Sequence, residues 1–498
     1  MDNAIAVFDI GKTNKKILIF NQQMEILDER VKQFEQINQG EILSDDITAI
    51  NEWFFTTLRE LASKYDIKAF ATSAHGATFM CIDEHGDLAV PELCYTFDPG
   101  EEFDENFYKK FGSPAELQIS TATPKLSSLI NMSKGIWYLK NKFPEDFKKV
   151  KQILAIPQYY GYLLTGKSGM DITYLGCHSY LWDFRKQKWS SVVEDMQIND
   201  ILPSVINKPW EVLGNVHAEA AQKTGLSKDT MVLMGIHDSN AALLPYLLSR
   251  KGDFVLNSTG TWCVTMRQDI KVDFTPDDIG KIVFYNMSAL ETPVKTAIFM
   301  GGLEFEFFDL IFKKIHADNT FPDYNDALYR EIIKEKKLFI LPSVVKGTGQ
   351  FPDNEAKVIE GDREYSFEDI NEGRYPQFFE HKQTAYAVLN ISLALQTSVA
   401  LKRVGKAPEA PVFTEGGFRN NLPYNKVLSA IYEHSEVYLT NLKEASAFGA
   451  ALTAKIAIEK REPFAMSDVI QIDYDKVDKA DLPGITAYMD AFLSHLKV

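Results

Sequence analysis

The stretch Ile5-Ala-Val-Phe-Asp-Ile-Gly-Lys-Thr-Asn-Lys-Lys-Ile-Leu-Ile-Phe20 decides the fold. It opens with an apolar run, becomes polar from Asp9 to Thr13 around Gly11, and is apolar again from Ile17 to Phe20. Two short apolar runs on either side of a polar turn with glycine are typical of two strands joined by a tight turn. The sequence therefore predicts a strand, a turn and a strand at its start.

A second unit of this kind lies near the middle of the chain. Phe254 to Leu256 lead into a polar turn, Ser258-Thr-Gly-Thr261, and a further apolar run extends from Trp262 to Met266. The patterns around both units predict helices at 50–65, 128–141, 385–404, 444–454 and from 424, and strands at 68–73, 231–234, 412–414 and 436–439. This alternation favours an α/β protein whose two halves each carry one hairpin.

Composition limits the classes of partner. Of 498 residues, 45% are hydrophobic and 24% are charged, and the net charge is −16, which indicates a folded protein and argues against non-specific nucleic-acid binding. The four cysteines form no CxxC pair and the histidines form no HExxH motif, so the sequence predicts neither a disulfide framework nor a zinc site. We expect a cytoplasmic protein with no secretion signal and no membrane span.

The two polar turns are candidate phosphate sites. Backbone N–H groups of the first turn and the Thr13 hydroxyl can cradle a phosphate, while Asp9 can face a hydrated Mg²⁺ ion. Taken alone, an Asp-x-Gly stretch is more often a plain turn without a ligand, and the first turn by itself favours that interpretation. The second turn, with Gly260 and Thr261, favours the phosphate interpretation, because two such turns can clasp one phosphate chain.

Gly235-Ile-His-Asp238 offers a candidate general base. It follows the expected strand at 231–234 and precedes a helical stretch, so Asp238 is placed either as a helix N-cap or as a base facing a cleft. The residues alone favour the cap. His237 beside it can hydrogen-bond a substrate hydroxyl, and His75-Gly76 form another candidate ligand-facing turn after the strand at 68–73.

One motif match is rejected. Gly161-Tyr-Leu-Leu-Thr-Gly-Lys-Ser168 satisfies the P-loop pattern, but a P-loop requires a strand before it and a helix after it. Tyr159, Tyr160 and Leu164 instead form an apolar helical face, which predicts a helix that ends at Gly166. The small residues from Ala445 to Ala451 leave two interpretations open, close approach of a flat ligand or tight packing of a helix.

Taken together, these segments resemble the FGGY family of carbohydrate kinases over nearly the whole chain. The segment from Asp9 to Lys16 looks like the first phosphate motif, Ser258 to Thr261 like the second, and Thr414 to Asn420 like the adenosine motif. Further matches are Pro124-Lys125, Ile136-Trp137, Leu164-Thr-Gly166, Asp171 and the helix at 445–451. The resemblance implies a two-lobed, actin-like ATPase (ribonuclease H-like) fold with duplicated mixed sheets flanked by helices. It implies a sugar-binding lobe at 1–246 and a nucleotide-binding lobe at 247–498.

The resemblance also implies roles for individual residues. Asp238 becomes the catalytic base, which reverses the preference for the cap, and Asp9 the contact to Mg²⁺. The implied sugar contacts are His75, Gly76, Asp98, His237 and Asp238. The implied ATP contacts are Gly11, Lys12, Thr13, Asn14, Lys16, Gly260, Thr261, Gly416, Gly417 and Asn420.

Three positions depart from the family pattern. Lys12 replaces a small residue in the first phosphate turn, so it either contacts phosphate or points to solvent. Gln158 stands where many members have Asp, and no Arg follows Asp98, which puts the inherited sugar contacts in question.

The pairing of His237-Asp238 with the following Ser-x-Gly-Thr-Trp262 is more similar to the rhamnulokinase and fuculokinase branch than to others. It implies transfer of the γ-phosphoryl group of Mg-ATP to a 6-deoxy-ketohexose, L-rhamnulose or L-fuculose. A pentulose such as xylulose or ribulose is the alternative substrate, and an actin-like nucleotide switch is the alternative function. The expected partners are the sugar and ATP, with no nucleic acid or membrane, and a homodimer is compatible with the sequence.

Overall fold

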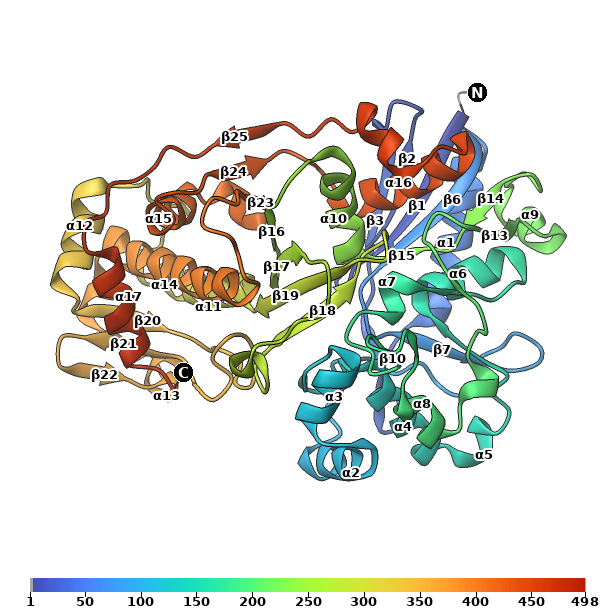
Figure 1. Cartoon of the computed structure of the whole chain (residues 1–498), viewed down its shortest axis with the longest axis horizontal. Coiled ribbons are helices and arrows are strands. Elements are labelled where there is room, and N and C mark those ends of the chain that lie inside the picture. Colours follow the sequence, from blue (N-terminus) through green and yellow to red (C-terminus); the bar gives the residue numbers. More distant parts are fainter. Residues whose placement is uncertain (1–2, 498) are drawn as a thin grey trace.

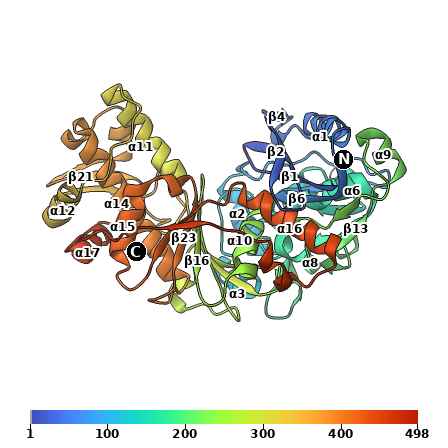
Figure 2. The same ribbon diagram turned by 90° about the horizontal axis from the view of Figure 1, so that it is seen from above.

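The computed structural model describes residues 3–497 and shows two lobes, each built on one large mixed sheet (Figures 1 and 2). The first lobe contains a seven-stranded sheet in the order β13-β14-β6-β1-β2-β3, with β15 also paired to β6. Its strands are β1 (Asn3–Ile10), β2 (Asn14–Phe20), β3 (Ile26–Gln33), β6 (Asp66–Ala74), β13 (Val212–Asn215), β14 (Met231–Leu233) and β15 (Ile236–His237).

The second lobe contains another seven-stranded sheet, in the order β18-β19-β17-β16-β23-β24-β25. Its strands are β16 (Val255–Thr259), β17 (Cys263–Gln268), β18 (Val283–Met287), β19 (Pro293–Phe299), β23 (Val412–Gly416), β24 (Val437–Thr440) and β25 (Tyr474–Lys476). The smaller strands of the chain are β4 (Gln36–Gln39), β5 (Ile42–Asp45), β7 (Phe79–Ile82), β8 (Gln152–Ala155), β9 (Met170–Asp171), β10 (Trp182–Asp183), β11 (Lys188–Trp189), β12 (Ile206–Asn207), β20 (Leu338–Leu341), β21 (Lys357–Glu360) and β22 (Arg363–Tyr365).

The two sheets repeat one arrangement. In the first, β1 forms an antiparallel hairpin with β2 and lies parallel to β6; in the second, β16 forms a hairpin with β17 and lies parallel to β23. Both predicted hairpins are thus confirmed. Parallel strands place their carboxyl ends at one edge, so the turn after each hairpin's first strand lies beside the end of the neighbouring strand.

Helices flank both sheets (Figure 1). Those of the first half are α1 (Ile47–Ala62), α2 (Glu101–Phe111), α3 (Pro114–Thr121), α4 (Met132–Lys142), α5 (Pro144–Phe147), α6 (Ile156–Thr165), α7 (Ile172–Leu175), α8 (Ser191–Met196), α9 (Ala218–Thr224) and α10 (Asp238–Ser249). Those of the second half are α11 (Gly301–His316), α12 (Asp326–Glu335), α13 (Phe367–Asn371), α14 (Lys382–Arg403), α15 (Leu422–Ile431), α16 (Ala445–Glu459) and α17 (Ile485–Ser494).

Two helices begin at other residues than predicted, and a cap or the local backbone conformation explains each difference. The helix expected at 50–65 begins at Ile47, because the Asp46 side chain accepts a hydrogen bond from the Ala49 N–H group and caps it. The helix expected from 128 begins only at Met132, since Ser128 has a φ of 51°, in the left-handed region that a helix excludes.

The rejected P-loop is a helix end, as predicted. Helix α6 stops at Thr165, and Gly166 caps it with a left-handed φ of 68°, which glycine adopts without the penalty of a Cβ atom. Lys167 is exposed directly after this cap.

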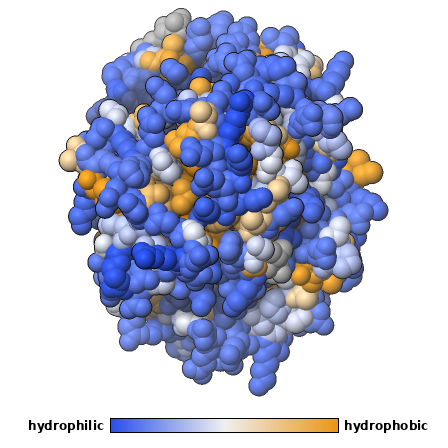
Figure 3. Space-filling view, turned by 90° about the vertical axis from the view of Figure 1, so that its left-hand side faces the viewer, coloured by the Kyte–Doolittle hydropathy of each residue, from blue (hydrophilic) through white to orange (hydrophobic). Residues whose placement is uncertain are grey.

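The longest helix, α14, belongs to the core. It is long and apolar enough to cross a membrane, but 89% of its most apolar stretch is buried inside the protein. The outer face of the second lobe is mostly hydrophilic, with apolar residues in small groups (Figure 3). Burial within a lobe therefore accounts for the apolar character of α14.

Helix α16 lies against the first lobe although it comes late in the chain (Figure 1). Its residues Ala447, Ala450 and Ala451 share a core cluster with residues of β1 and β6. A Cβ atom on Gly449 would lie 1.9 Å from the carbonyl oxygen of Ala241 in α10, so glycine is required for the close contact of the two helices. The division at residues 246 and 247 stays a prediction, and tight packing explains part of the small-residue stripe.

Candidate active site

A cavity of about 500 Å³ opens between the two lobes. The first lobe lines it with the turn after β6, the loop after α7 and the start of α10, and the second lobe lines it with the turns after β16 and β23. The start of α16 completes the wall with Ala445 and Ser446. The strand ends that the hairpin repeat brings to one edge therefore face a common space.

Asp238 reaches this space from the first position of α10, directly after β15. One carboxylate oxygen accepts a hydrogen bond of 2.6 Å from the Ser239 N–H group, and 34% of the side chain is exposed. Burial among the lobes raises the pKa of Asp238 to about 6, opposed by the hydrogen bonds from Ser239. The carboxyl group is thus ionised near neutral pH yet basic enough to accept a proton.

Asp9 lies at the end of β1, and the Ser446 hydroxyl of α16 donates a 3.0 Å hydrogen bond to its carboxylate. Burial raises the pKa of Asp9 to about 6, and the negative charge of Asp238 adds to this increase. A carboxylate whose proton affinity is raised by a neighbouring carboxylate would be relieved by a cation. Asp9 therefore fits a contact to a hydrated Mg²⁺ ion, which prefers few carboxylates and several waters.

Three neutral imidazoles surround the part of the cavity nearest Asp238. Burial lowers the pKa values of His75, His178 and His237 to about 3. The Nδ1 atom of His75 lies 3.0 Å from the Gly76 carbonyl oxygen, and its buried Nε2 atom has no hydrogen-bond partner within the described residues. Uncharged rings with free polar atoms are suited to the hydroxyl groups of a small polar ligand.

Gly76 gives these rings room. A Cβ atom at this position would lie 2.5 Å from the ring of His178 and 3.0 Å from the Nε2 atom of His237. The turn predicted to face a ligand therefore does line the cavity, and only glycine fits there.

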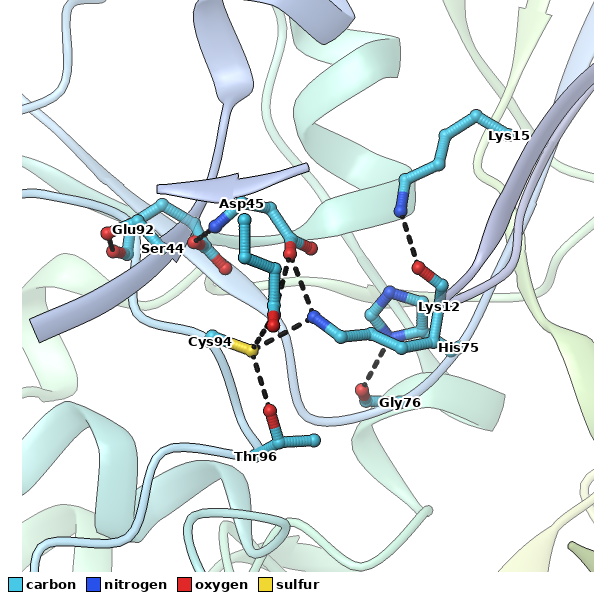
Figure 4. Close-up of polar contacts among 10 residues, drawn as sticks. Lys12, Lys15, Ser44, Asp45, His75, Gly76, Glu92, Cys94 and Thr96 are labelled. Atoms are coloured by element: carbon cyan, nitrogen blue, oxygen red, sulfur yellow. Dashed lines mark hydrogen bonds and ion pairs between the residues drawn. The ribbon is translucent and has the colours of Figure 1, made fainter. Parts of the chain in front are cut away.

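Lys12 has a partner that the sequence did not indicate (Figure 4). Its Nζ atom donates to Asp45 at 2.8 Å and lies 2.9 Å from the sulfur of Cys94, and its ammonium group lies over the Tyr95 ring. Burial opposes the charge, but Asp45 and Cys94 raise the pKa of Lys12 above its ordinary value. Lys12 therefore does not point freely to solvent: it is paired inside the first lobe at the cavity wall, and its contact to phosphate stays a prediction.

The turn predicted to be the second phosphate site lies on the cavity wall. Gly260 and Thr261 line the cavity, and a Cβ atom on Gly260 would meet only the Trp262 carbonyl oxygen, at 3.9 Å. Gly416 faces the same space with a φ of 76°, and a Cβ atom there would lie 2.0 Å from the Thr259 carbonyl oxygen. The close approach of β23 to β16 therefore demands glycine at position 416, in the segment predicted to be the adenosine motif.

Several predicted contacts lie outside the cavity wall among residues 3–497. This group comprises Asp9, Gly11, Thr13, Asn14, Lys16, Asp98, Gly417 and Asn420. Lys16 is paired instead with Glu444 at 2.6 Å, the Asn14 side chain accepts from Gln33, and exposed Asp98 accepts from the Gly100 N–H group. Gln158, another departure from the family pattern, donates to the Met234 carbonyl oxygen. The side chains of Asn14, Lys16, Asp98 and Gln158 thus have protein partners in the present arrangement of the lobes.

Sequence reasoning gave no role to several polar residues of the wall. Cys177, His178 and Tyr95 line the first lobe's side, and Glu415 lines the second lobe's side. Burial raises the pKa of Glu415 to about 7, and the Tyr246 hydroxyl donates to its carboxylate at 3.1 Å. The adjacent Cys177-His178 pair was a usable signal, but no spacing rule connects it with His237, far along the chain.

Two protein-family models match this chain, one in each half. The model described as "FGGY family of carbohydrate kinases, N-terminal domain" matches residues 4–245, and "Carbohydrate kinase FGGY, C-terminal domain" matches residues 251–462. Two lobes with a cavity between them and both family domains define a protein of the sugar-kinase class. The chain belongs to the FGGY family of carbohydrate kinases.

Rhamnulokinases are among the curated proteins that are similar to this chain. A rhamnulokinase of Halalkalibacterium halodurans is 24% identical over 270 residues, which cover 53% of this chain and 55% of that protein. A rhamnulokinase of Enterococcus faecalis is 25% identical over 189 residues, which cover 38% of this chain and 36% of that protein. The chain thus spans about half or less of the length of these curated relatives, and the matches confirm the resemblance to the rhamnulokinase branch.

Solved structures confirm the actin-like, two-lobed fold. A carbohydrate kinase from Novosphingobium aromaticivorans superposes with a TM-score of 0.78 at 24% identity, covering 99% of this chain and 98% of that one. Ligand-bound xylulose kinase from Lactobacillus acidophilus gives a TM-score of 0.81 at 15% identity, covering 99% and 97% of the two chains.

Proposed function

We propose that the protein transfers the γ-phosphoryl group of Mg-ATP to a hydroxyl group of a ketose bound between the lobes. The observation that carries the proposal is that Asp238 of the first lobe and the Gly260 turn of the second line one cavity. A base on one wall and a phosphate cradle on the other are the two components that phosphoryl transfer to an alcohol needs.

In the proposed mechanism Asp238 accepts the proton of the attacking hydroxyl group. The sugar oxygen forms a bond to the γ-phosphorus, the bond from this phosphorus to the β,γ-bridging oxygen breaks, and ADP leaves with that oxygen. His75 and His237, neutral and next to the base, orient the sugar through its other hydroxyl groups. Mg²⁺ beside Asp9 would offset the negative charge of the phosphates.

Backbone N–H groups around Gly260 and Thr261 would hold the phosphate chain, and the strand end at Gly416 would leave room for the nucleotide. Gly11, Thr13 and Asn14 would join this clasp from the first lobe after the lobes close. We do not assign Lys12 to it, since Asp45 holds its ammonium group.

For the substrate we propose a 6-deoxy-ketohexose, L-rhamnulose or L-fuculose, phosphorylated at its first carbon. The similarity to rhamnulokinases supports this choice. A pentulose is the second candidate, because a 133-residue segment is 28% identical to a protein named L-xylulose/3-keto-L-gulonate kinase from Escherichia coli. We further propose that the protein acts in the cytoplasm on small molecules alone; the homodimer stays a prediction.

A coupled ADP-release assay over a panel of ketoses, glycerol and aldoses tests the proposal. We expect the highest kcat/KM for L-rhamnulose or L-fuculose and smaller values for pentuloses, because a missing methyl group costs only about 10- to 200-fold in an apolar pocket. Phosphorus NMR of the product identifies the phosphorylated hydroxyl. A clear preference for D-xylulose or glycerol would overturn the substrate and leave the kinase; ADP release with none of the sugars would overturn both.

A further inference from the structure

The side chains of Cys177, His178 and His237 meet at the sugar end of the cavity. Their ligand atoms, one sulfur and two ring nitrogens, all lie within 4.8 Å of one another. The Cys177 sulfur is 3.3 Å from the His237 Nε2 atom. A tetrahedral Zn²⁺ ion with bonds of about 2.3 Å to sulfur and 2.0–2.1 Å to nitrogen separates such a pair by about 3.6 Å.

A hydrogen bond orients the His178 ring for coordination, and a carboxylate lies near the outer nitrogen of the His237 ring. The His178 Nδ1 atom lies 2.9 Å from the Ile130 carbonyl oxygen, which can only accept, so Nδ1 carries the proton and the lone pair is on Nε2. The His237 Nδ1 atom lies 3.4 Å from the Asp238 carboxylate, although this contact is too poorly aligned to count as a hydrogen bond. A backbone carbonyl and a carboxylate are the usual outer partners of histidines that bind a metal through their other nitrogen.

A second, independent observation places the two Nε2 atoms around one point. A Cβ atom added to Gly76 would lie 2.6 Å from the Nε2 atom of His178 and 3.0 Å from that of His237. Both nitrogens therefore lie beside Gly76, which lines the cavity together with the two histidines.

We propose that Cys177, His178 and His237 form a site for Zn²⁺ or a similar thiolate-binding divalent cation, and that its occupancy excludes the sugar. Binding releases the thiol proton of Cys177 to solvent and forms one metal–sulfur and two metal–nitrogen bonds. Three protein ligands leave a fourth position for water, and all three residues line the cavity, so an ion can enter from it.

The site is chemically distinct from the Mg²⁺ position beside Asp9. Sulfur and imidazole ligands select zinc and its neighbours, whereas Mg²⁺ requires oxygen ligands, so an excess of Mg²⁺ does not fill the site. A metal bonded to His237 removes one proposed sugar contact and occupies the space next to Asp238. The kinase is therefore expected to be inhibited by zinc in competition with the sugar.

Cobalt(II) titration tests the site without sugar or ATP, so its result does not depend on the proposed function. The wild-type protein, in excess Mg²⁺, should bind one Co²⁺ ion with a thiolate-to-cobalt charge-transfer band. Cys177→Ser should lose the band, and His178→Asn should weaken binding by at least about 10- to 100-fold. Asn is chosen because His178 has a φ of 38°, which Asn tolerates. Cys81→Ala, which removes a buried cysteine of β7, is the matched control and should keep the band.

No charge-transfer band in the wild-type protein, or a band that persists in Cys177→Ser, would overturn the site. If Cys177→Ser does not fold, as judged by circular dichroism, unaltered Co²⁺ affinity in folded His178→Asn overturns it equally. In kinase assays at saturating Mg-ATP, Zn²⁺ should raise the apparent KM for sugar and leave kcat unchanged. A zinc-loaded enzyme with an unchanged KM would contradict the exclusion of sugar.

Discussion

Replacing Asp238 by Asn should make the protein more stable and nearly inactive. The pKa of this carboxyl group rises from 3.8 to about 6 in the folded protein. An acid with a raised pKa destabilises the fold once it is ionised: the cost is absent below the unfolded pKa, grows with pH and is complete above about pH 6. Asn keeps the shape and the acceptor for the Ser239 N–H group and removes this cost.

The magnitude follows from the shift. About 2 pKa units correspond to about 3 kcal/mol at most. Because 34% of the side chain is exposed, solvent screening reduces this to about 1 kcal/mol. We expect Tm to rise by about 1–3 °C near pH 8, and by less near pH 5, where the wild-type carboxyl group is largely protonated. The Asp238→Asn substitution should also lower kcat by about 10²- to 10⁴-fold, because the base is lost. The KM for ATP should stay almost unchanged.

Differential scanning calorimetry and coupled ADP release measure the two effects. Asp229→Asn, at an exposed carboxylate before β14, is the matched control and should change neither. A variant with normal turnover would show that Asp238 is a structural residue at the helix start. A variant that is inactive and less stable at high pH would refute the pKa argument.

Three further results are expected. In pH profiles, kcat/KM should fall about tenfold per unit as the pH drops below about 6, because Asp238 must be ionised to accept a proton; a flat profile down to about pH 5 would contradict this. Lys167→Ala should leave the KM for ATP unchanged, since Lys167 is exposed after a helix end, whereas Gly260→Val should raise it steeply by filling the cavity; the reverse pattern would restore the P-loop. Small-angle scattering should show a more compact particle with sugar and a non-hydrolysable nucleotide together, and an unchanged profile would speak against lobe closure.

Local patterns predicted the fold because both hairpins lie within short stretches of sequence. The apolar runs around Gly11 and Gly260 specify the paired strands directly. Because one such hairpin lies in each half of the chain, the sequence also indicates that the sheet architecture is duplicated. The position of α16 against β1 could not be predicted, because the packing of its alanines on a distant sheet leaves no local pattern.

The site was predictable in part for the same reason. Asp238, His75 and Gly260 lie at strand ends, where side chains face a common edge, and the structure places all three on the cavity wall. The pairing of Lys12 with Asp45 brings the first turn against the end of β5, 33 positions away in the sequence, and no motif indicates this contact. The contact of Cys177 with His237 likewise joins residues that are 60 positions apart, and no sequence pattern indicates it.

The destination of the γ-phosphoryl group tests the central claim most directly. The enzyme is incubated with γ-labelled Mg-ATP in the presence and absence of L-rhamnulose and L-fuculose, and the label is followed into sugar phosphate and inorganic phosphate. Because a closed cavity excludes water, we predict label predominantly in sugar phosphate and little hydrolysis without sugar. Label released only as inorganic phosphate at a rate independent of any ketose, together with nucleotide-dependent assembly of the protein, would contradict the account and identify an actin-like nucleotide switch.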